Sequence, residues 1–518
     1  MPGSTQNKRD NSAAMIDAGD ANAAMIESDR NVTRFGYQSL DVILQCRDLG
    51  ELKEKLNYIE KNINARGLKA RIEKMNAFEA YLGSIPGNRF TNQRVPLLST
   101  KNYAHTMNVS SPWLGSQFNP NPNLPKKSSP LFLATCSGMK QFRFVNHVED
   151  VGHTLVLGPT GAGKSTLLNL IVAQAHRYEN AQVFIFEKGL SAYATTTALG
   201  GDYYSPLKDK TLAFAPLKTL ETQEDRIWAS EWLMNLIKLQ GVEVNSAKRK
   251  LLDDGLNRLT KSPHRSLSHL ALNVQNKELR DALAPFLKAQ KGVMGNVMDA
   301  EEDGLQNVNK STLGFDISAL LQQQPRIAAP LLTHLFRWVE RRLDGRPSTI
   351  ILDEAWVMLS HELFREQIID WLRTLRKKNC YVIFATQSVS DIADSPIKNI
   401  LLESCPTKIF LPNPEALTEV GRVFYKNIGL NDTQINTIAR AQSKAEYYLV
   451  SKVGKRLINL ELSKSELAII GASSPEDVKQ VKSLQQKSKS GEWVAGMLKY
   501  KGCDNEAQEY LELIAENN

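Results

Sequence analysis

The chain has 518 residues, of which 42% are hydrophobic and 23% charged, a composition typical of globular proteins with a substantial core. At about 150 residues per domain, this length predicts roughly three structural units. The sequence has no apolar run of the ~18 residues that a membrane span needs, and its first residues do not resemble a secretory signal, so we expect a cytoplasmic protein without its own membrane span.

Charge and cysteine content bear on three further possibilities: a nucleic-acid partner, a disulfide framework and a cysteine zinc site. The net charge of +8 is a diffuse surplus rather than a patch, which leaves nucleic acid open as a partner without indicating it. The five cysteines lie far apart and form no CxxC pair, so neither a disulfide framework nor a cysteine zinc site is expected.

The first 117 residues predict a partial α+β domain. Residues 13–30 favour a helix, 34–48 a strand, 51–67 an amphipathic helix and 68–75 a second strand, which together resemble a βαβ unit. Prolines, asparagines and serines are concentrated in 118–130. Because these residues interrupt helices and strand ladders, we expect a linker there.

From residue 131 to about 470, strand and helix patterns alternate, as a mostly parallel α/β sheet requires. Between about 219 and 300 the apolar spacing is helical throughout, which predicts an all-helical insertion. Residues 445–462 resemble a hairpin, and 471–518 predict C-terminal helices. The expected core strands are 153–158, 181–187, 348–354, 381–387 and 407–412.

The stretch GPTGAGKS, residues 158–165, fits the phosphate-binding pattern GxxxxGK[ST]. A short apolar strand precedes it and an amphipathic helix follows, so free backbone N–H groups and the helix dipole would face an anion. A glycine-rich turn without a ligand is the alternative, but it does not require this strand–loop–helix order. The predicted nucleotide-binding residues are Gly158, Pro159, Thr160, Gly161, Ala162, Gly163, Lys164, Ser165 and Thr166.

Hydrolysis also needs a metal ligand and a group that activates water. Residues 349–354 read TIILDE, a buried-strand pattern that ends in two carboxylates. We expect Ser165 and Asp353 to hold Mg²⁺, with Glu354 polarising the attacking water and Lys164 binding phosphate. Alternatively, the two acids only cap the next helix, where the helix dipole favours negative charge.

Two further groups follow the acidic strand. Gln387 ends the next predicted strand, where its amide could sense the γ-phosphate, although an amide in that position is often structural. A basic cluster lies between, and it offers Arg376, or less favourably Arg373, as an arginine finger for a neighbouring subunit. The dipole at the end of a helix explains such a cluster equally well. Glu187, which ends the second strand, is a weaker polar candidate.

Several stretches together resemble the CagE/TrbE/VirB ATPases of type IV secretion and conjugation systems. The similarity extends upstream to RFGYQSLDVIL, NAFEAYLGSIPGN and LLSTKNYAHTMNVSSPW, and so covers nearly the whole chain. The motifs that carry it are VGHTLVLGPTGAGKSTLLN, LDGRPSTIILDEAW, WLRTLRKKNCYVIFATQS, ESCPTKIFLPNP and IIGASSPED.

This resemblance implies a RecA-like motor domain of the HerA/FtsK kind with a helical insertion. It also implies assembly into a hexamer or a lower oligomer, beside inner-membrane components of the apparatus and peripheral to the membrane. The family's phosphate loop corresponds to Gly158–Ser165, its acids to Asp353 and Glu354, its sensor to Gln387 and its finger to Arg376.

Two features depart from the family pattern. The chain begins inside what resembles the family's N-terminal domain, which suggests a short form, a fragment or half of a split protein. Glu187 stands where the family would have Asp.

The expected function is an ATP- and Mg²⁺-dependent motor that energises assembly of, or substrate transfer through, a secretion or conjugation apparatus. A DNA-translocating coupling pump is the alternative enzyme, although such pumps normally bring membrane-spanning helices. A nucleotide-binding scaffold without turnover is the alternative from another class, and a water activator such as Glu354 argues against it.

Overall fold

The computed structural model describes residues 12–30, 32–64, 69–88, 90–92, 94–106, 113–136, 139–209, 211–354, 362–387, 392, 395–488 and 491–517. The chain divides into two compact units, Met1–Pro112 and Trp113–Asn518. Among the described residues, no helix combines the length and the apolar character that crossing a bilayer requires.

The first unit consists of short elements with little buried surface. The two predicted helices are present, but the strand expected over 34–48 is reduced to three residues, and its partner is β2 rather than 68–75. No strand is formed by the described residues 69–75, so that prediction was wrong. Apolar residues here do not face a core: among the described side chains before residue 107, Thr33 alone is buried. The elements are α1 (Ser12–Asp29), β1 (Phe35–Tyr37), α2 (Leu49–Asn64), α3 (Ala77–Gly83), β2 (Leu97–Ser99) and α4 (Thr100–Thr106).

The second unit is built on one mixed sheet, with 11 strands among the described residues, in the order β4-β3-β13-β12-β11-β5-β10-β9-β6-β8-β7. Neighbouring strands from β11 to β7 in this order run parallel, and β12, β13, β3 and β4 extend the sheet with antiparallel pairs. The predicted α/β class with a mostly parallel sheet is therefore confirmed. The strands are β3 (Phe132–Cys136), β4 (Lys140–Phe144), β5 (Thr154–Leu157), β6 (Gln182–Glu187), β7 (Asp202–Tyr204), β8 (Thr312–Asp316), β9 (Ser348–Asp353), β10 (Cys380–Thr386), β11 (Thr407–Phe410), β12 (Glu446–Ser451) and β13 (Gly454–Asn459).

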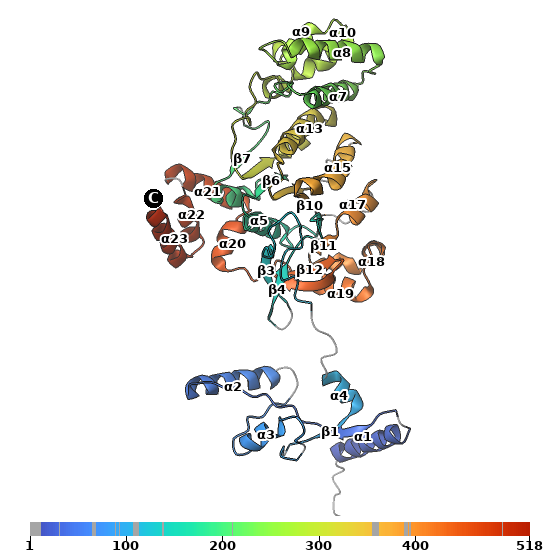
Figure 1. Ribbon diagram of the computed structural model, residues 1–518, viewed down its shortest axis with the longest axis vertical. Coiled ribbons are helices and arrows are strands. Elements are labelled where there is room, and N and C mark those ends of the chain that lie inside the picture. Colours follow the sequence, from blue (N-terminus) through green and yellow to red (C-terminus); the bar gives the residue numbers. More distant parts are fainter. Residues whose placement is uncertain are drawn as a thin grey trace, which may run out of the picture. The chain divides into compact units, whose positions relative to one another are not determined.

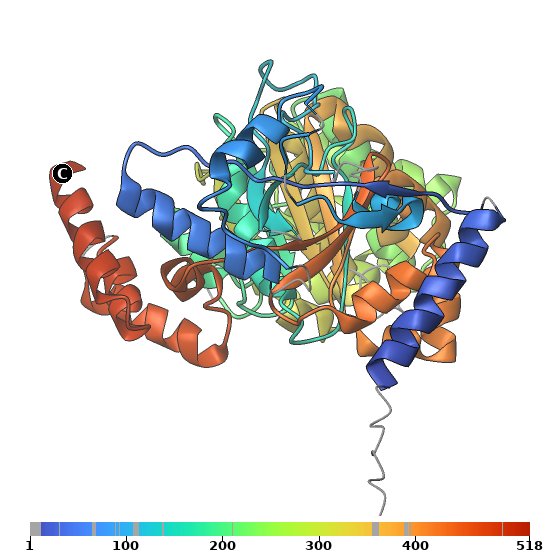
Figure 2. The ribbon, with the colours of Figure 1, turned by 90° about the horizontal axis from the view of Figure 1, so that it is seen from below.

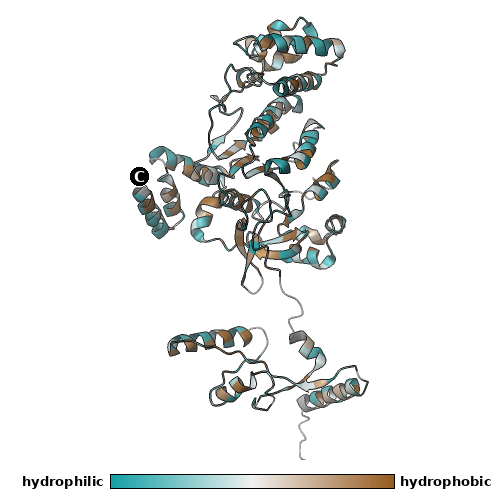
Figure 3. Ribbon diagram, viewed as in Figure 1, coloured by the Kyte–Doolittle hydropathy of each residue, from teal (hydrophilic) through white to brown (hydrophobic). Residues whose placement is uncertain are grey.

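Helices cover both faces of this sheet, because side chains alternate along each buried strand. Leu155 and Leu157 of β5 pack on one face with the helical insertion, α13 and α15, whereas Val156 packs on the other face with α5. Hydrophobic colours gather in α5 and in the strands beside it (Figure 3). The helices flanking the sheet are α5 (Lys164–Ala175), α6 (Tyr193–Ala198), α12 (Ser318–Leu321), α13 (Pro325–Arg342), α15 (Glu362–Thr374), α17 (Lys398–Ser404), α18 (Glu419–Asn427), α19 (Asp432–Arg440) and α20 (Lys464–Ile470), with 3₁₀ turns η3 (Leu375–Lys378) and η4 (Pro414–Leu417).

The predicted helical segment 219–300 contains helices and no strand among its described residues. Helices α7 to α10 gather at one end of the second unit (Figure 1). The three C-terminal helices are grouped at one flank in both views (Figures 1 and 2). The insertion comprises α7 (Gln223–Leu239), α8 (Ser246–Leu259), α9 (Leu267–Asn273), α10 (Lys277–Leu283), η1 (Ala284–Phe286), η2 (Lys288–Gln290) and α11 (Gly295–Met298), and the C-terminal group α21 (Pro475–Lys487), α22 (Trp493–Tyr500) and α23 (Asp504–Asn517).

The proline-rich stretch 118–130 lies within the second unit rather than between the two units. Asn119, Asn121 and Leu124 are buried in this stretch, and Asn121 donates a hydrogen bond to the Asn379 side chain at 3.0 Å. Proline and asparagine here build turns that pack against the sheet edge, so a composition typical of linkers instead forms part of the domain.

Candidate nucleotide-binding site

The phosphate loop connects β5 to α5, which begins at Lys164. Gly161 and Gly163 have φ angles of 81° and 103°, a region that residues with a Cβ atom adopt only with strain. At Gly158 the limit is space, since an added Cβ would overlap the Leu411 side chain. Backbone conformation thus requires glycine at 161 and 163, and the space beside Leu411 requires it at 158. Helix α5 presents its N-terminus to the loop.

The two predicted acids meet the loop lysine at the carboxyl edge of the sheet. The Lys164 ammonium donates to Asp353 Oδ1 at 2.7 Å and forms a second ion pair with Glu354, although the partners are almost 190 positions apart. Lys164 and Asp353 are each only 7% exposed. Burial raises the pKa of Asp353 above its usual value, and the nearby ammonium opposes that shift. The cluster is held by charge in a region with little water, where such pairs interact strongly.

Glu354 has an unusual backbone conformation for its residue type. Its φ angle is 59°, in the left-handed region, and its N–H donates to the Ala385 carbonyl at 3.0 Å. A non-glycine residue held there costs about 1–3 kcal/mol, and such strain tends to occur at functional sites. The bend ends β9 and brings this carboxylate to Lys164.

Gln387 lies beside the loop, as predicted from its place after β10. That strand runs between β5 and β9 in the sheet. The Thr160 hydroxyl donates to the Gln387 side-chain oxygen, so the loop and the end of β10 are in direct contact. Gln387 is also exposed, which leaves its amide accessible.

Arg376 and Arg373 lie away from this cluster. Arg376 is in η3, just before β10 begins, and its guanidinium is 3.6 Å from an Asp150 carboxylate oxygen. The seven residues of β10 separate that edge from the loop by about 20 Å. Arg373 lies exposed in the last turn of α15, near the same edge. The structure therefore does not bring either arginine to the phosphate loop of its own chain.

Glu187 is buried at the end of β6, and its carboxylate is hydrogen-bonded to neighbouring residues. Its carboxylate accepts hydrogen bonds from the Ser191 and Tyr203 hydroxyls and, at 2.9 Å, from the Ala192 N–H. Burial raises the pKa of Glu187, and the charge of nearby Asp353 adds to the shift. These contacts give it a structural role in the β6–α6 turn behind the acids.

Sequence reasoning missed the start of β12 and the turn before it. Lys444 and Tyr447 contact the phosphate loop through hydrogen bonds to its backbone carbonyls. A hairpin pattern predicted the strand, but no signal in a single sequence places this strand's start against a loop almost 300 residues earlier.

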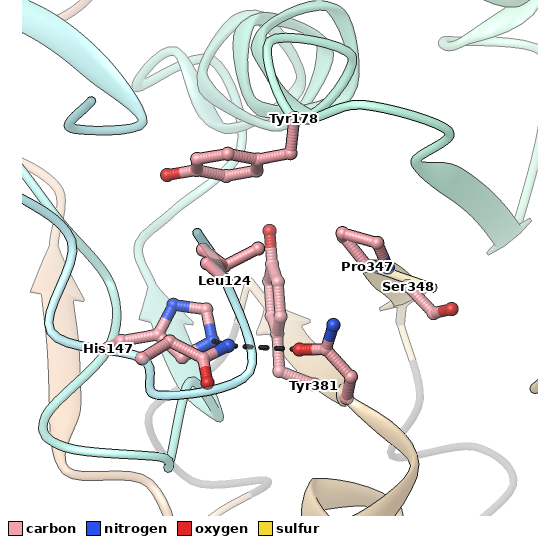
Figure 4. A pocket seen from close by; sticks show the side chains of 8 residues that line it. Leu124, His147, Tyr178, Pro347, Ser348 and Tyr381 are labelled. Carbon is pink, nitrogen blue, oxygen red and sulfur yellow. Dashed lines mark hydrogen bonds between the residues drawn. The ribbon is translucent and has the colours of Figure 1, made fainter. Parts of the chain in front are cut away.

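A small cavity lies at the opposite, amino-terminal edge of the parallel strands. Tyr381 points its hydroxyl from β10 into the space below Tyr178, and Asn121 joins His147 to Asn379 at its side (Figure 4). Its volume is about 10 Å³, room for roughly one water molecule, so it cannot hold a nucleotide.

The residues at the carboxyl edge fit a magnesium-bound nucleotide. The loop contributes backbone amides and a buried ammonium for phosphate, while Asp353 and the partly exposed Ser165 offer the oxygen ligands that Mg²⁺ prefers. The Lys164 ammonium, which belongs to the loop, bonds to both acids, so the loop and the two carboxylates lie within reach of one bound group.

Comparisons with known proteins show which families this chain resembles. Residues 4–94 match the CagE, TrbE, VirB family, described as a component of the type IV transporter system, and residues 281–498 match the TraG P-loop domain. The chain is 42% identical to the second portion of a probable conjugal transfer protein TrbE of Sinorhizobium fredii, over 97% of this chain and 76% of that protein. It is 43% identical to the conjugal transfer protein TrbE of Rhizobium radiobacter, over 93% of this chain but 59% of that protein.

One solved structure supports the fold. VirB4 of Thermoanaerobacter pseudethanolicus superposes with a TM-score of 0.53 at 16% sequence identity, and the match covers 65% of this chain and 98% of that one.

Proposed function

The chain belongs to the CagE, TrbE, VirB family, and on that premise we propose that it is a Mg²⁺-dependent ATPase that energises assembly of, or substrate transfer through, a conjugative or type IV secretion apparatus. The contact that carries this proposal is Lys164 bonded to both Asp353 and Glu354. A loop that binds phosphate and a pair of acids that can hold metal and activate water converge on one point.

The proposed roles follow from this geometry. Backbone N–H groups between Thr160 and Thr166 would hold the phosphates, and Lys164 neutralises charge between them. Pro159 has no N–H, and the Gly158 N–H donates to the Thr386 carbonyl. Ser165 and Asp353 would hold Mg²⁺, which supplies further neutralisation of the phosphate oxygens. An arriving γ-phosphate competes with Glu354 for the Lys164 ammonium, which would free this carboxylate to accept a proton from water.

Gln387 would couple phosphate binding in the loop to a conformational change at the end of β10. Its oxygen accepts the Thr160 hydroxyl, so a phosphate that reorders the loop also changes the contact at the end of β10. Release of such a contact on hydrolysis is one way that nucleotide-driven switches work. We place the readout of the γ-phosphate at this pair.

The position of Arg376 supports an oligomer. At the edge opposite its own loop, it could serve only the nucleotide of a neighbouring copy, as a finger supplied in trans. We therefore propose a hexamer or a lower oligomer that works on the cytoplasmic side, peripheral to the inner membrane and beside its membrane-bound components.

Mg²⁺-dependent ATP hydrolysis by the purified oligomer tests the proposal. Lys164→Ala should abolish turnover, because it removes the buried cation shared by phosphate and acids. The matched control is Lys261→Ala, an exposed lysine of the helical insertion, which should retain full turnover. Equal activity in all three proteins, or none in the wild type, would overturn the proposed function.

A further inference from the structure

The start of β12 and the turn before it, residues 444–447, lie against the phosphate loop. Strand β12 pairs antiparallel with β11, which pairs parallel with β5. In this register Tyr448 faces Phe410, and Phe410 faces Leu157, the last residue of β5. Tyr447, one position earlier, therefore lies level with the loop itself.

Two hydrogen bonds join residues 444 and 447 to consecutive loop residues. The Tyr447 hydroxyl donates to the Gly163 carbonyl at 3.1 Å, and the Lys444 N–H donates to the Ala162 carbonyl at 3.0 Å. A Cβ added at Gly163 would lie 2.5 Å from the Tyr447 hydroxyl and 3.1 Å from the Lys444 Cα. The fit is close enough that the hydroxyl occupies the space a side chain at 163 would need.

Both partners are held firmly. Tyr447 is fully buried in the apolar cluster that includes α5, so its hydroxyl is fixed by packing. Lys444 has a φ angle of 67°, a left-handed conformation that a lysine adopts only when its surroundings impose it. Its N–H is thereby directed at Ala162.

These contacts act on the part of the loop that binds phosphate. Gly163 precedes Lys164 and caps α5 with a φ angle of 103°. Fixing the carbonyls of 162 and 163 toward β12 fixes the peptide planes, and so the amides, on the opposite side. Amides that already point toward the anion site bind an anion without the free-energy cost of reordering the loop.

We propose that Tyr447 is a positioning residue of the nucleotide site, whose hydroxyl, together with the Lys444 N–H, holds the phosphate loop in its anion-binding curve. The inference rests on the proposed ATPase function. It predicts that loss of the hydroxyl weakens nucleotide binding rather than the fold.

The test compares Tyr447→Phe with Tyr448→Phe in the full chain. Tyr448 is the neighbouring, nearly buried tyrosine of the same strand, and it packs on the other face of the sheet. We measure Kd for a fluorescent ATP analogue with Mg²⁺, kcat, KM and Tm. Tyr447→Phe should raise Kd and KM about three- to tenfold, as expected for one lost hydrogen bond, with kcat within about twofold. Tyr448→Phe should leave all three constants unchanged.

Hydrogen exchange of the loop amides gives a second readout. Exchange over residues 158–166 should be faster in Tyr447→Phe and unchanged in Tyr448→Phe. The inference is overturned if Kd and loop exchange match the wild type, or if both variants change alike in proportion to their Tm. A wild type that binds no nucleotide would instead reject the proposed function, so the two failures are distinguishable.

Discussion

Glu354 is the residue whose chemistry the structure constrains most closely. Its left-handed backbone and its ion pair with Lys164 place a carboxylate at the end of β9 that a simple helix cap would not need. Asp353, next to it, is almost fully buried and faces the same ammonium. The alternative that both acids serve only as caps does not account for this shared contact.

Glu354→Gln should separate nucleotide binding from hydrolysis. The amide keeps the shape of the side chain but cannot accept a proton from water, so kcat should fall by about 10²- to 10⁴-fold while ATP affinity changes little. Equilibrium ATP binding and phosphate release together check this expectation. A variant with near wild-type kcat would show that another group activates water.

His153 makes stability depend on pH. Its Nδ1 accepts the Val382 N–H at 3.0 Å, and burial lowers the pKa of this histidine to about 4, with the Arg376 charge adding to the effect. The unfolded chain therefore binds the proton first, near pH 6.5. This contribution to stability is fully present above pH 6.5 and is lost as pH falls toward 4, by about 1.4 kcal/mol per pH unit.

Denaturant unfolding at several pH values measures that slope. His153→Asn, whose side-chain oxygen can accept the same N–H, should unfold with a shallower pH dependence over this window than the wild type. Parallel curves for the two proteins would show that His153 does not titrate on unfolding.

At the scale of elements, the core strands were the most predictable. Strands β5, β6, β9, β10 and β11 lie within the predicted ranges or extend one residue beyond them, because each is a short apolar run buried on both faces. Their carboxyl ends meet at one edge, and that is why the loop, the acids and Gln387 could be placed together from the sequence.

Other elements could not be predicted, for physical reasons. In 34–48 and 69–75 the structure leaves most apolar side chains partly or largely exposed, so their spacing in the sequence does not indicate a buried core. The turns of 118–130 are stabilised by contacts such as Asn121 to Asn379, which are distant in sequence. The approach of Tyr447 to Gly163 depends on strand order, which local patterns do not encode.

The join between β5 and α5 gives an element-scale prediction. Gly158→Ala would drive a Cβ into the Leu411 side chain at the end of β11, an overpacking that typically costs about 1–3 kcal/mol. Denaturant unfolding should show that loss. Gly345→Ala, at a site with open space around the added carbon, is the comparison, where the cost is only that of a positive φ angle. No loss at Gly158 would mean that β11 can move away from the loop.

At the scale of the whole molecule, the described core lies in one unit. The three hydrophobic clusters all consist of residues after 112. A chain that begins at Trp113 should therefore fold, with a main calorimetric transition close to that of the full chain. An unfolded product would show that Met1–Pro112 contributes to the stability of the second unit.

Assembly gives a second prediction at this scale. If Arg376 acts on a neighbouring copy, Arg376→Ala should lower kcat about 10³-fold. Mixing it with Lys164→Ala should restore measurable turnover at mixed interfaces, where one copy supplies the arginine and its neighbour an intact loop. Mixtures as inactive as the two parents, despite subunit exchange, would remove Arg376 from the mechanism.

We propose that residues 158–166, Asp353 and Glu354 hold one magnesium nucleotide between them. A double-mutant cycle on the Mg²⁺ dependence of ATP affinity tests it most directly, with Ser165→Ala, Asp353→Asn and the double variant. We expect each single variant to lose most of the gain in affinity that Mg²⁺ confers, and the double variant to lose no more. Fully additive losses, or a gain that survives in either single variant, would contradict it.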